Sequence, residues 1–124
     1  MTARRILLVE DDRFLRRACE ASLRQRGFSV AVAVDGEEAL DKVRQAPPDL
    51  ILLDLLMPRM TGLEVLRTLR AQEPTRGIPV LILSNSSREQ DAEEIRTLGV
   101  SDYLVKANLS LQELGDRVTR LLGD

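Results

Sequence analysis

Three side chains that could do chemistry together each close a short, mainly aliphatic run. Asp11, Asp54 and Lys106 stand at the ends of three such runs. If these runs are parallel strands of one open sheet, their carboxyl ends meet at one edge, where such sheets keep their sites. Carboxylates gathered around an ammonium group at that edge would suit a magnesium-assisted phosphoryl acceptor.

An acidic turn follows the first of these runs. Glu10, Asp11 and Asp12 are consecutive, and right-handed crossovers can bring this turn beside Asp54. Two unit charges about 4 Å apart repel by about 4 kcal/mol at an effective dielectric of about 20, so the cluster should raise a pKa or hold a cation. The chain has no histidine and one cysteine, which favours a hard cation with oxygen ligands, Mg²⁺. Asp12 fits the helix N-cap position as well as it fits the site.

Asp54 is the predicted nucleophile of this site. A carboxylate that accepts a phosphoryl group needs donors for the remaining phosphoryl oxygens, and Ser84 and Lys106 end two further strands on the same edge. Ser84 could instead cap a helix, but Ser86 and Ser87 already fit that role.

Length and charge bound the function. A chain of 124 residues fits one domain over 1–124, with no room for an output domain. Its net charge of −2 offers no general attraction to nucleic acid or anionic membranes. The apolar runs are too short to span a membrane, and the N-terminus has no signal-type segment, so we expect a cytoplasmic protein. Cys19 has no partner for an intramolecular disulfide and fits a buried structural thiol.

Strand-type runs alternate five times with amphipathic helical stretches. This pattern predicts an α/β fold, a doubly wound five-stranded parallel sheet with helices on both faces. The expected strands cover residues 5–10, 29–34, 49–53, 78–83 and 101–105, with 29–34 at an edge. The expected helices cover 12–26, 36–45, 62–72, 87–98 and 110–122. Capping pairs support four starts: Asp35 with Glu38, Thr61 with Glu64, Ser86 with Glu89 or Ser87 with Gln90, and Ser110 with Glu113.

Several spaced elements resemble a known family. They are Glu10-Asp11, Asp54 followed by Met57-Pro58 and Gly62, Ser84, and the run 102–106. In this order, and over essentially the whole chain, they resemble the receiver domain of two-component response regulators. The resemblance implies a flavodoxin-like fold with strand order 2-1-3-4-5.

The resemblance also implies a phosphorylation site and a metal site. Asp54 would be phosphorylated by a partner sensor histidine kinase or phosphotransfer protein. Glu10, Asp11, Asp54 and the backbone carbonyl of Leu56 would hold Mg²⁺. The domain would act as a signalling module rather than an enzyme, although it could remove its own phosphoryl group.

A switch and a docking surface are implied in the same way. Ser84 and Lys106 would bind the phosphoryl oxygens, and Tyr103, read from the sequence as a half-buried aromatic, would turn inward when Ser84 moves. The surface of the fourth helix, fifth strand and fifth helix would then bind a downstream effector protein or form a homodimer.

Three residues depart from the family pattern. Ala107 stands where relatives usually have proline, and because a cis bond before a non-proline residue costs about 3 to 4 kcal/mol, we expect Lys106–Ala107 to be trans. Asn85 replaces a small residue, and Leu56 offers no polar group to orient an attacking water, which predicts slow self-dephosphorylation. These departures leave open an atypical receiver that binds proteins without phosphorylation.

Other function classes fit less well. An aspartyl phosphatase would need a second aspartate where Leu56 stands. A flavin carrier would need glycines and hydroxyls in the acidic turn. Direct DNA binding is also disfavoured, because Arg13, Arg16, Arg17 and Arg24 are interrupted by an acid and fit a solvated helix face.

Overall fold

The computed structural model, which describes residues 3–85 and 91–123, contains one sheet of five parallel strands. The strands are β1 (Arg5–Val9), β2 (Ser29–Ala33), β3 (Leu50–Asp54), β4 (Val80–Ser84) and β5 (Asp102–Val105). Their order is β2-β1-β3-β4-β5, as predicted, and β2 lies at an edge. The sheet therefore has the doubly wound, flavodoxin-like topology.

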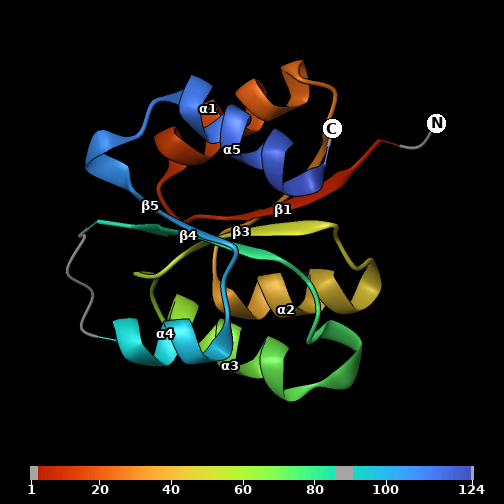
Figure 1. Cartoon of the computed structure of the whole chain (residues 1–124), viewed down its shortest axis with the longest axis vertical. Helices are drawn as coiled ribbons and strands as arrows, with labels where there is room; N and C mark the ends of the chain where they lie inside the picture. Colours follow the sequence, from red (N-terminus) through yellow and green to blue (C-terminus); the bar gives the residue numbers. More distant parts are fainter. Residues whose placement is uncertain (1–2, 86–90, 124) are drawn as a thin grey trace.

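Five helices cover the two faces of the sheet. They are α1 (Arg13–Gln25), α2 (Gly36–Gln45), α3 (Gly62–Ala71), α4 (Ala92–Leu98) and α5 (Leu111–Leu122). Figure 1 shows α1 and α5 on one face and α2, α3 and α4 on the other. Two 3₁₀ turns that the sequence did not predict are η1 (Glu73–Thr75) and η2 (Lys106–Asn108). Within the described ranges, no helix is both long and apolar enough to cross a membrane.

The alternation of side chains along the strands builds one core on each face. Leu52 and Leu81 pack with α1 and α5, whereas Ile51 and Ile82 pack with α2 and α3. The central strands β1, β3 and β4 are buried on both faces, which explains their uninterrupted aliphatic runs. Each such side chain contributes about 1.5 to 3 kcal/mol by leaving water, so the ends of these strands are held rigidly.

Capping pairs begin three helices as predicted. In each, the cap side chain accepts a hydrogen bond from the backbone N–H of the glutamate three residues on; the pairs are Asp35 with Glu38, Thr61 with Glu64, and Ser110 with Glu113. The described part of the fourth helix begins at Ala92. Residues 87–90 of its predicted range, and its predicted caps at 86–90, lie outside the described residues.

Strand boundaries differ from the predictions by one or two residues. The fourth strand begins at Val80 rather than at residue 78, since Pro79 has no N–H for the ladder. Asp54 and Ser84 are the last residues of their strands, not the residues after them. Gly27 and Gly99, which follow α1 and α4, have φ of 95° and 88°, a backbone conformation that favours glycine.

The interpretation of the α1 arginines as a solvated face holds for Arg24, whose side chain is 57% exposed, but it is wrong for Arg16, which is half-buried. Arg24 donates to the Val30 carbonyl at 2.8 Å, at the outer edge of β2. Lys42 of α2 donates to the Val32 carbonyl of the same strand. Arg16 turns back to the loop after β1, as described below. Two cations from opposite faces thus cover the exposed edge of β2.

Candidate functional site

The strand register brings Glu10 next to Asp54. Val9 of β1 is paired with Leu53 of β3, so the residue that follows each of them lies at the same level of the sheet. Glu10 is 0% exposed and Asp54 is 1% exposed. Two carboxylates are therefore held side by side by the backbone of two central strands, beyond the last fully apolar layer.

The neighbouring strands supply the predicted hydroxyl and ammonium groups. Asp54 is paired with Leu83, so Ser84 lies one residue further along β4, and Ser84 is paired with Val105. Ser84 is buried, and Lys106 follows Val105 at the start of η2. Glu10, Asp54, Ser84 and Lys106 therefore all lie at this edge of the sheet.

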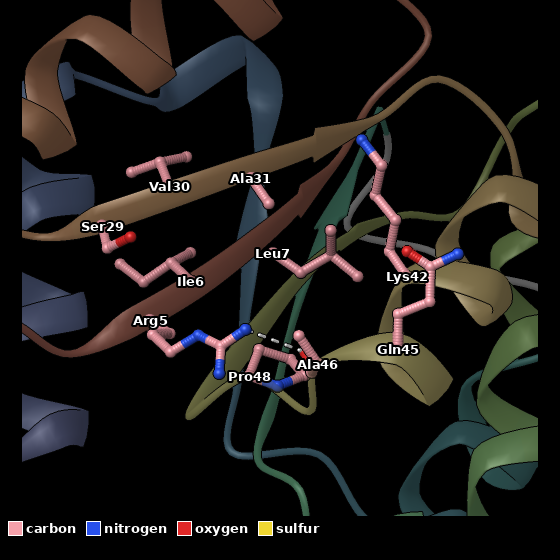
Figure 2. A pocket seen from close by; sticks show the side chains of 10 residues that line it. All are labelled: Arg5, Ile6, Leu7, Ser29, Val30, Ala31, Lys42, Gln45, Ala46 and Pro48. Carbon is pink, nitrogen blue, oxygen red and sulfur yellow. Dashed lines mark hydrogen bonds between the residues drawn. The ribbon is translucent and has the colours of Figure 1, made fainter.

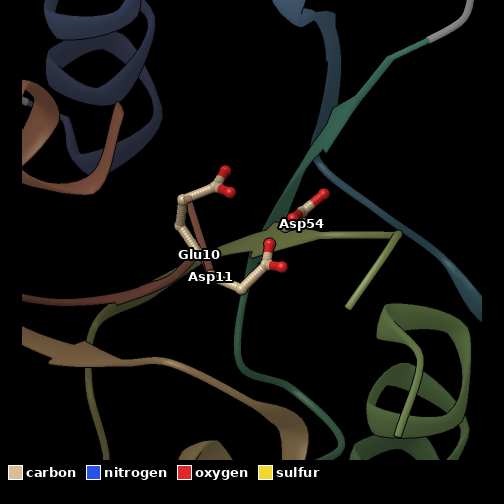
Figure 3. A group of neighbouring side chains, drawn as sticks. All are labelled: Glu10, Asp11 and Asp54. Atoms are coloured by element: carbon tan, nitrogen blue, oxygen red, sulfur yellow. The ribbon is translucent and has the colours of Figure 1, made fainter. Parts of the chain in front are cut away.

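Three carboxylates form one cluster at this edge (Figure 3). Glu10, Asp11 and Asp54 each offer an oxygen, and these oxygens lie within 4.8 Å of one another. Glu10 and Asp54 are buried, whereas Asp11 is exposed at the mouth of the cluster. The cluster thus opens to solvent on the Asp11 side, which gives a small ligand a way in.

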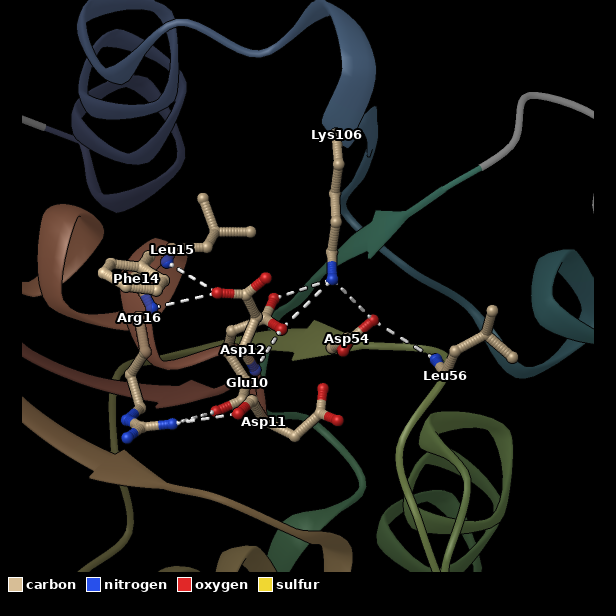
Figure 4. Close-up of polar contacts among 9 residues, drawn as sticks. All are labelled: Glu10, Asp11, Asp12, Phe14, Leu15, Arg16, Asp54, Leu56 and Lys106. Carbon is tan, nitrogen blue, oxygen red and sulfur yellow. Dashed lines mark hydrogen bonds and ion pairs between the residues drawn. The ribbon is translucent and has the colours of Figure 1, made fainter.

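Lys106 offsets part of the negative charge of the cluster (Figure 4). Its Nζ lies 2.9 Å from Oε1 and 3.1 Å from Oε2 of Glu10, and 3.1 Å from Oδ1 of Asp54. One ammonium group therefore faces two buried carboxylates, which leaves an excess of negative charge.

This excess shows in the protonation of Asp54. Burial and the charge of Glu10 raise the pKa of Asp54 to about 7, and Lys106 offsets only part of that rise. Burial lowers the pKa of Lys106, but its hydrogen bonds to Glu10 and Asp54 outweigh burial, so the pKa of Lys106 is raised. Near neutral pH both protonation states of Asp54 are therefore populated, and a cation bound there would favour the ionised form of Asp54.

Asp54 has one oxygen that is engaged and one that is not. Oδ1 accepts a hydrogen bond from the Leu56 N–H at 3.2 Å and faces Lys106. Oδ2 is buried and has no hydrogen-bond partner among the residues that the structure describes. Gly62 packs directly against the backbone of Asp54. A side chain does not fit at this position, because a Cβ would come within 2.2 Å of the Asp54 carbonyl oxygen.

Asp12 serves as the N-cap of α1. Its Oδ1 accepts hydrogen bonds from the N–H groups of Phe14 and Leu15 at 2.9 and 3.1 Å. The N–H of Asp12 donates to Oε2 of Glu10 at 3.0 Å. Of the two roles open from the sequence, the structure therefore shows the capping role.

Two predicted switch residues lie on the same side of the site. Ser84 ends β4, and Tyr103 of β5 is half-buried against the core that includes Ile95. The described residues contain no cis peptide bond, so Lys106–Ala107 is trans, as expected from Ala107.

Arg16 is a site neighbour that sequence reasoning missed. Its Nη1 donates to the carbonyl oxygens of Glu10 and Asp11 at 3.0 and 3.3 Å. The side chain is half-buried, unlike the exposed Arg13 and Arg17. The sequence offered one signal for this contact, since Arg16 lies in the second turn of a helix that follows an acidic loop. Helical periodicity alone could not distinguish Arg16 from Arg13 and Arg17.

A cavity of about 230 Å³ lies at the opposite, amino end of the sheet (Figure 2). Its lining includes Arg5, Ala31 and Lys42. Arg5 donates to the Ala46 carbonyl at 3.4 Å and Lys42 to a β2 carbonyl, so both cations already hold backbone groups. This cavity lacks the convergent charged groups of the carboxylate cluster.

The donor set of the cluster fits a hard divalent cation. Its ligands are carboxylate oxygens, the type that Mg²⁺ and Ca²⁺ prefer. The unpartnered buried Oδ2 of Asp54 is a polar atom for which a cation would provide the missing contact. The residues present therefore suit Mg²⁺.

Comparisons with known proteins agree with this geometry. Residues 6–119 match the family described as the response regulator receiver domain. Response regulator MprA of Mycolicibacterium vanbaalenii is 42% identical over 120 residues, covering 95% of this chain and 50% of that protein. The chain thus spans about half the length of the curated relatives it matches.

Solved structures show the same fold. The chemotaxis response regulator CheY4 of Vibrio cholerae superposes with a TM-score of 0.88 at 31% identity, covering 97% of this chain and 99% of that one. The receiver domain of a sensor histidine kinase of Pseudomonas aeruginosa, with a magnesium ion coordinated in its active-site cleft, gives 0.88 at 32% identity, covering 99% and 100%. The sheet order, the carboxylate cluster and these matches together show that the chain belongs to the response regulator receiver domain family.

Proposed function

We propose that this domain is a phosphorylation switch whose phosphoryl acceptor is Asp54. The observation that carries the proposal is the state of that carboxylate. It is buried, one oxygen faces Lys106, and the other has no partner within the described residues. A buried carboxylate with a raised pKa and an unused oxygen costs stability, which is typical of a functional site.

The chemistry is a single phosphoryl transfer. An oxygen of Asp54 attacks the phosphorus of a phosphohistidine on a partner kinase or phosphotransfer protein, the P–N bond breaks, and its electron pair leaves with the imidazole. The product is an acyl phosphate on Asp54. Mg²⁺ held by Glu10, Asp11, Asp54 and the Leu56 carbonyl would neutralise charge on the transferring group.

The chain's own residues then stabilise the product. Lys106, already 3.1 Å from Oδ1 of Asp54, can pair with a phosphoryl oxygen, and the buried hydroxyl of Ser84 can donate to another. Leu56 is 61% exposed and carries no polar side-chain group, so slow self-dephosphorylation stays a prediction.

We place the output on α4, β5 and α5. An apolar cavity of about 270 Å³ between α4 and β5 is lined by Ile95 and Tyr103, which gives the tyrosine ring room to change its position. Movement of Ser84 toward a phosphoryl group would bias two arrangements of this surface, and an effector protein or a second copy would bind one of them.

The test is the intact mass of the protein after incubation with acetyl phosphate and Mg²⁺. We expect a gain of one phosphoryl group that is lost in Asp54→Asn and when EDTA replaces Mg²⁺. Asp116→Asn, an exposed carboxylate on α5, is the matched control and should gain the group normally. No gain in the unsubstituted protein would contradict the proposal and would favour a receiver that binds partners without phosphorylation.

A further inference from the structure

We propose that Arg16 is a positioning residue that orients the acidic turn for Mg²⁺. The inference rests on the proposed function, because it assumes that the turn holds a cation. The Arg16 side chain extends from α1 back to the loop after β1. Its guanidinium holds two adjacent backbone carbonyls, and this sets where the side chains of Glu10 and Asp11 point.

The contact is made by one nitrogen. Nη1 of Arg16 lies 3.0 Å from the carbonyl oxygen of Glu10 and 3.3 Å from that of Asp11. The N–H of Arg16 is bonded to the Asp12 carbonyl at 2.9 Å, so its backbone is fixed within the helix. Figure 4 shows the guanidinium on the side of the turn away from Lys106. The two carbonyls therefore point toward the Arg16 guanidinium, away from the ammonium group.

The two carboxylates of the turn depend on this contact to different degrees. The carboxylate of Glu10 is buried and is also held by Lys106 and by the Asp12 N–H. Asp11 is exposed, so packing does little to fix it. Apart from its interaction with the neighbouring Asp54 carboxyl group, the Asp11 side chain is thus oriented mainly through its backbone, whose carbonyl accepts from Arg16. Backbone carbonyl oxygens can also bind hard cations. In our proposal Arg16 binds the carbonyls of Glu10 and Asp11, so that the carboxylates of these residues, and not their carbonyls, face the ion.

If Arg16 acted only through its charge, its removal would change the affinity for Mg²⁺ in the opposite direction. A positive charge close to a cation site repels the cation, so removing it should tighten binding. If Arg16 acts by orienting the turn, removing it should weaken binding, because groups behind the ligands commonly change metal affinity by about tenfold or more. The sign of the change therefore separates the two roles.

The experiment measures Mn²⁺ binding from the electron paramagnetic resonance signal of the free ion, with Mg²⁺ added as competitor. The proteins are the unsubstituted chain, Arg16→Met, Arg16→Lys and Arg17→Met, and urea unfolding shows that each is folded. We expect Arg16→Met to raise the Kd for both ions by about tenfold. Arg16→Lys, which keeps a donor, should restore part of the affinity. Arg17→Met removes the same charge from the exposed neighbour and should leave the Kd unchanged or slightly lower.

The outcomes separate the inference from the function on which it rests. Equal or tighter binding in Arg16→Met, with the unsubstituted chain binding normally, would overturn the positioning role and leave the proposed function intact. Absence of binding in the unsubstituted chain would overturn the metal site itself. If Arg16→Met fails to fold, Arg16→Lys decides: a raised Kd, with the positive charge kept, would support the positioning role, and a Kd equal to or below that of the unsubstituted chain would overturn it.

Discussion

Two ion-paired groups of this protein have the same chemistry in different surroundings. At the edge of the sheet, Lys106 is 15% exposed and faces the buried carboxylates of Glu10 and Asp54. Between α3 and α4, Arg67 binds Glu94 with side chains that are 50% and 39% exposed. In the exposed pair the hydrogen bond from Arg67 lowers the pKa of Glu94, as for an ordinary salt bridge. In the buried group the pKa of Asp54 is raised even though Lys106 lies beside it.

The difference shows that burial, rather than the presence of an oppositely charged partner, decides whether the pKa of the carboxylate is raised or lowered. Removing a carboxylate from water costs several kcal/mol, and one ammonium shared by two carboxylates does not repay it. The exposed pair avoids this cost because water solvates both partners. Only the buried group is therefore left in a state that a proton or a cation can change.

The largest expected effect is that of Lys106→Met. Without the ammonium, two buried carboxylates would face each other uncompensated, which should lower the free energy of unfolding by about 3 to 5 kcal/mol. The measurement is urea unfolding at pH 8 in EDTA. Lys42→Met, at the other lysine of the chain, should cost clearly less, because the Lys42 side chain is 36% exposed and does not face two buried carboxylates. Combining Lys106→Met with Asp54→Asn should recover much of the loss, and a Lys106→Met protein of normal stability would contradict the comparison.

The second effect is a pH dependence carried by Asp54. Its pKa rises from 3.8 in the unfolded reference to about 7 in the fold. Between these values the unfolded chain has lost a proton that the folded chain keeps, so the contribution of Asp54 to stability is greatest below pH 4 and falls as the pH rises to 7. The slope from this group reaches about 1.4 kcal/mol per pH unit. Asp54→Asn should remove this slope in metal-free urea unfolding, so equal slopes in both proteins would exclude the assignment.

The third effect is stabilisation by Mg²⁺. At pH 8, Mg²⁺ at ten times its Kd should raise the free energy of unfolding by about 1.4 kcal/mol. At pH 6 the gain at the same concentration should be smaller, because protons compete for Asp54. NaCl of equal ionic strength controls for screening. A gain that is equal at both pH values, or that persists in Asp54→Asn, would place the bound ion elsewhere.

The smallest effect is expected at the exposed pair. Arg67→Ala and Glu94→Ala should each shift the urea midpoint only slightly, and the shift should shrink further in high salt. The double variant should equal the sum of the two single changes within error. A large, salt-resistant coupling would show that solvent exposure is not what separates the two groups.

Much of the fold and the site could be predicted, because the same hydrophobic pattern indicates both the strands and the residues at their ends. Uninterrupted aliphatic runs predict strands buried on both faces, and the first polar residue after each run then lies at the sheet edge. Asp11, Asp54 and Lys106 are placed in this way and Glu10 through the acidic turn, and the structure brings their side chains together. The predicted boundaries differ by a residue or two, because a ladder ends where backbone pairing ends rather than where hydrophobicity ends.

Side chains that fold back onto the backbone could not be predicted. Arg16 and Arg24 occupy polar positions of an amphipathic helix, and periodicity shows only that these positions face away from the core. Whether a long side chain meets solvent or a carbonyl depends on the path of a neighbouring loop or strand. Asp12 poses the same problem, since an aspartate before a helix suits a cap and a ligand equally well until the first turn is seen.

The covered edge of β2 has a consequence for how molecules of this protein meet one another in a crowded solution. An apolar edge strand such as β2 (Ser29–Ala33) is ordinarily a template onto which another chain can add a strand, the first step of aggregation. Here an incoming strand would have to displace Arg24 and Lys42 from the Val30 and Val32 carbonyls. Each of these two side chains is also paired with a glutamate one helical turn away. Together they hinder the addition of a further strand at the β2 edge.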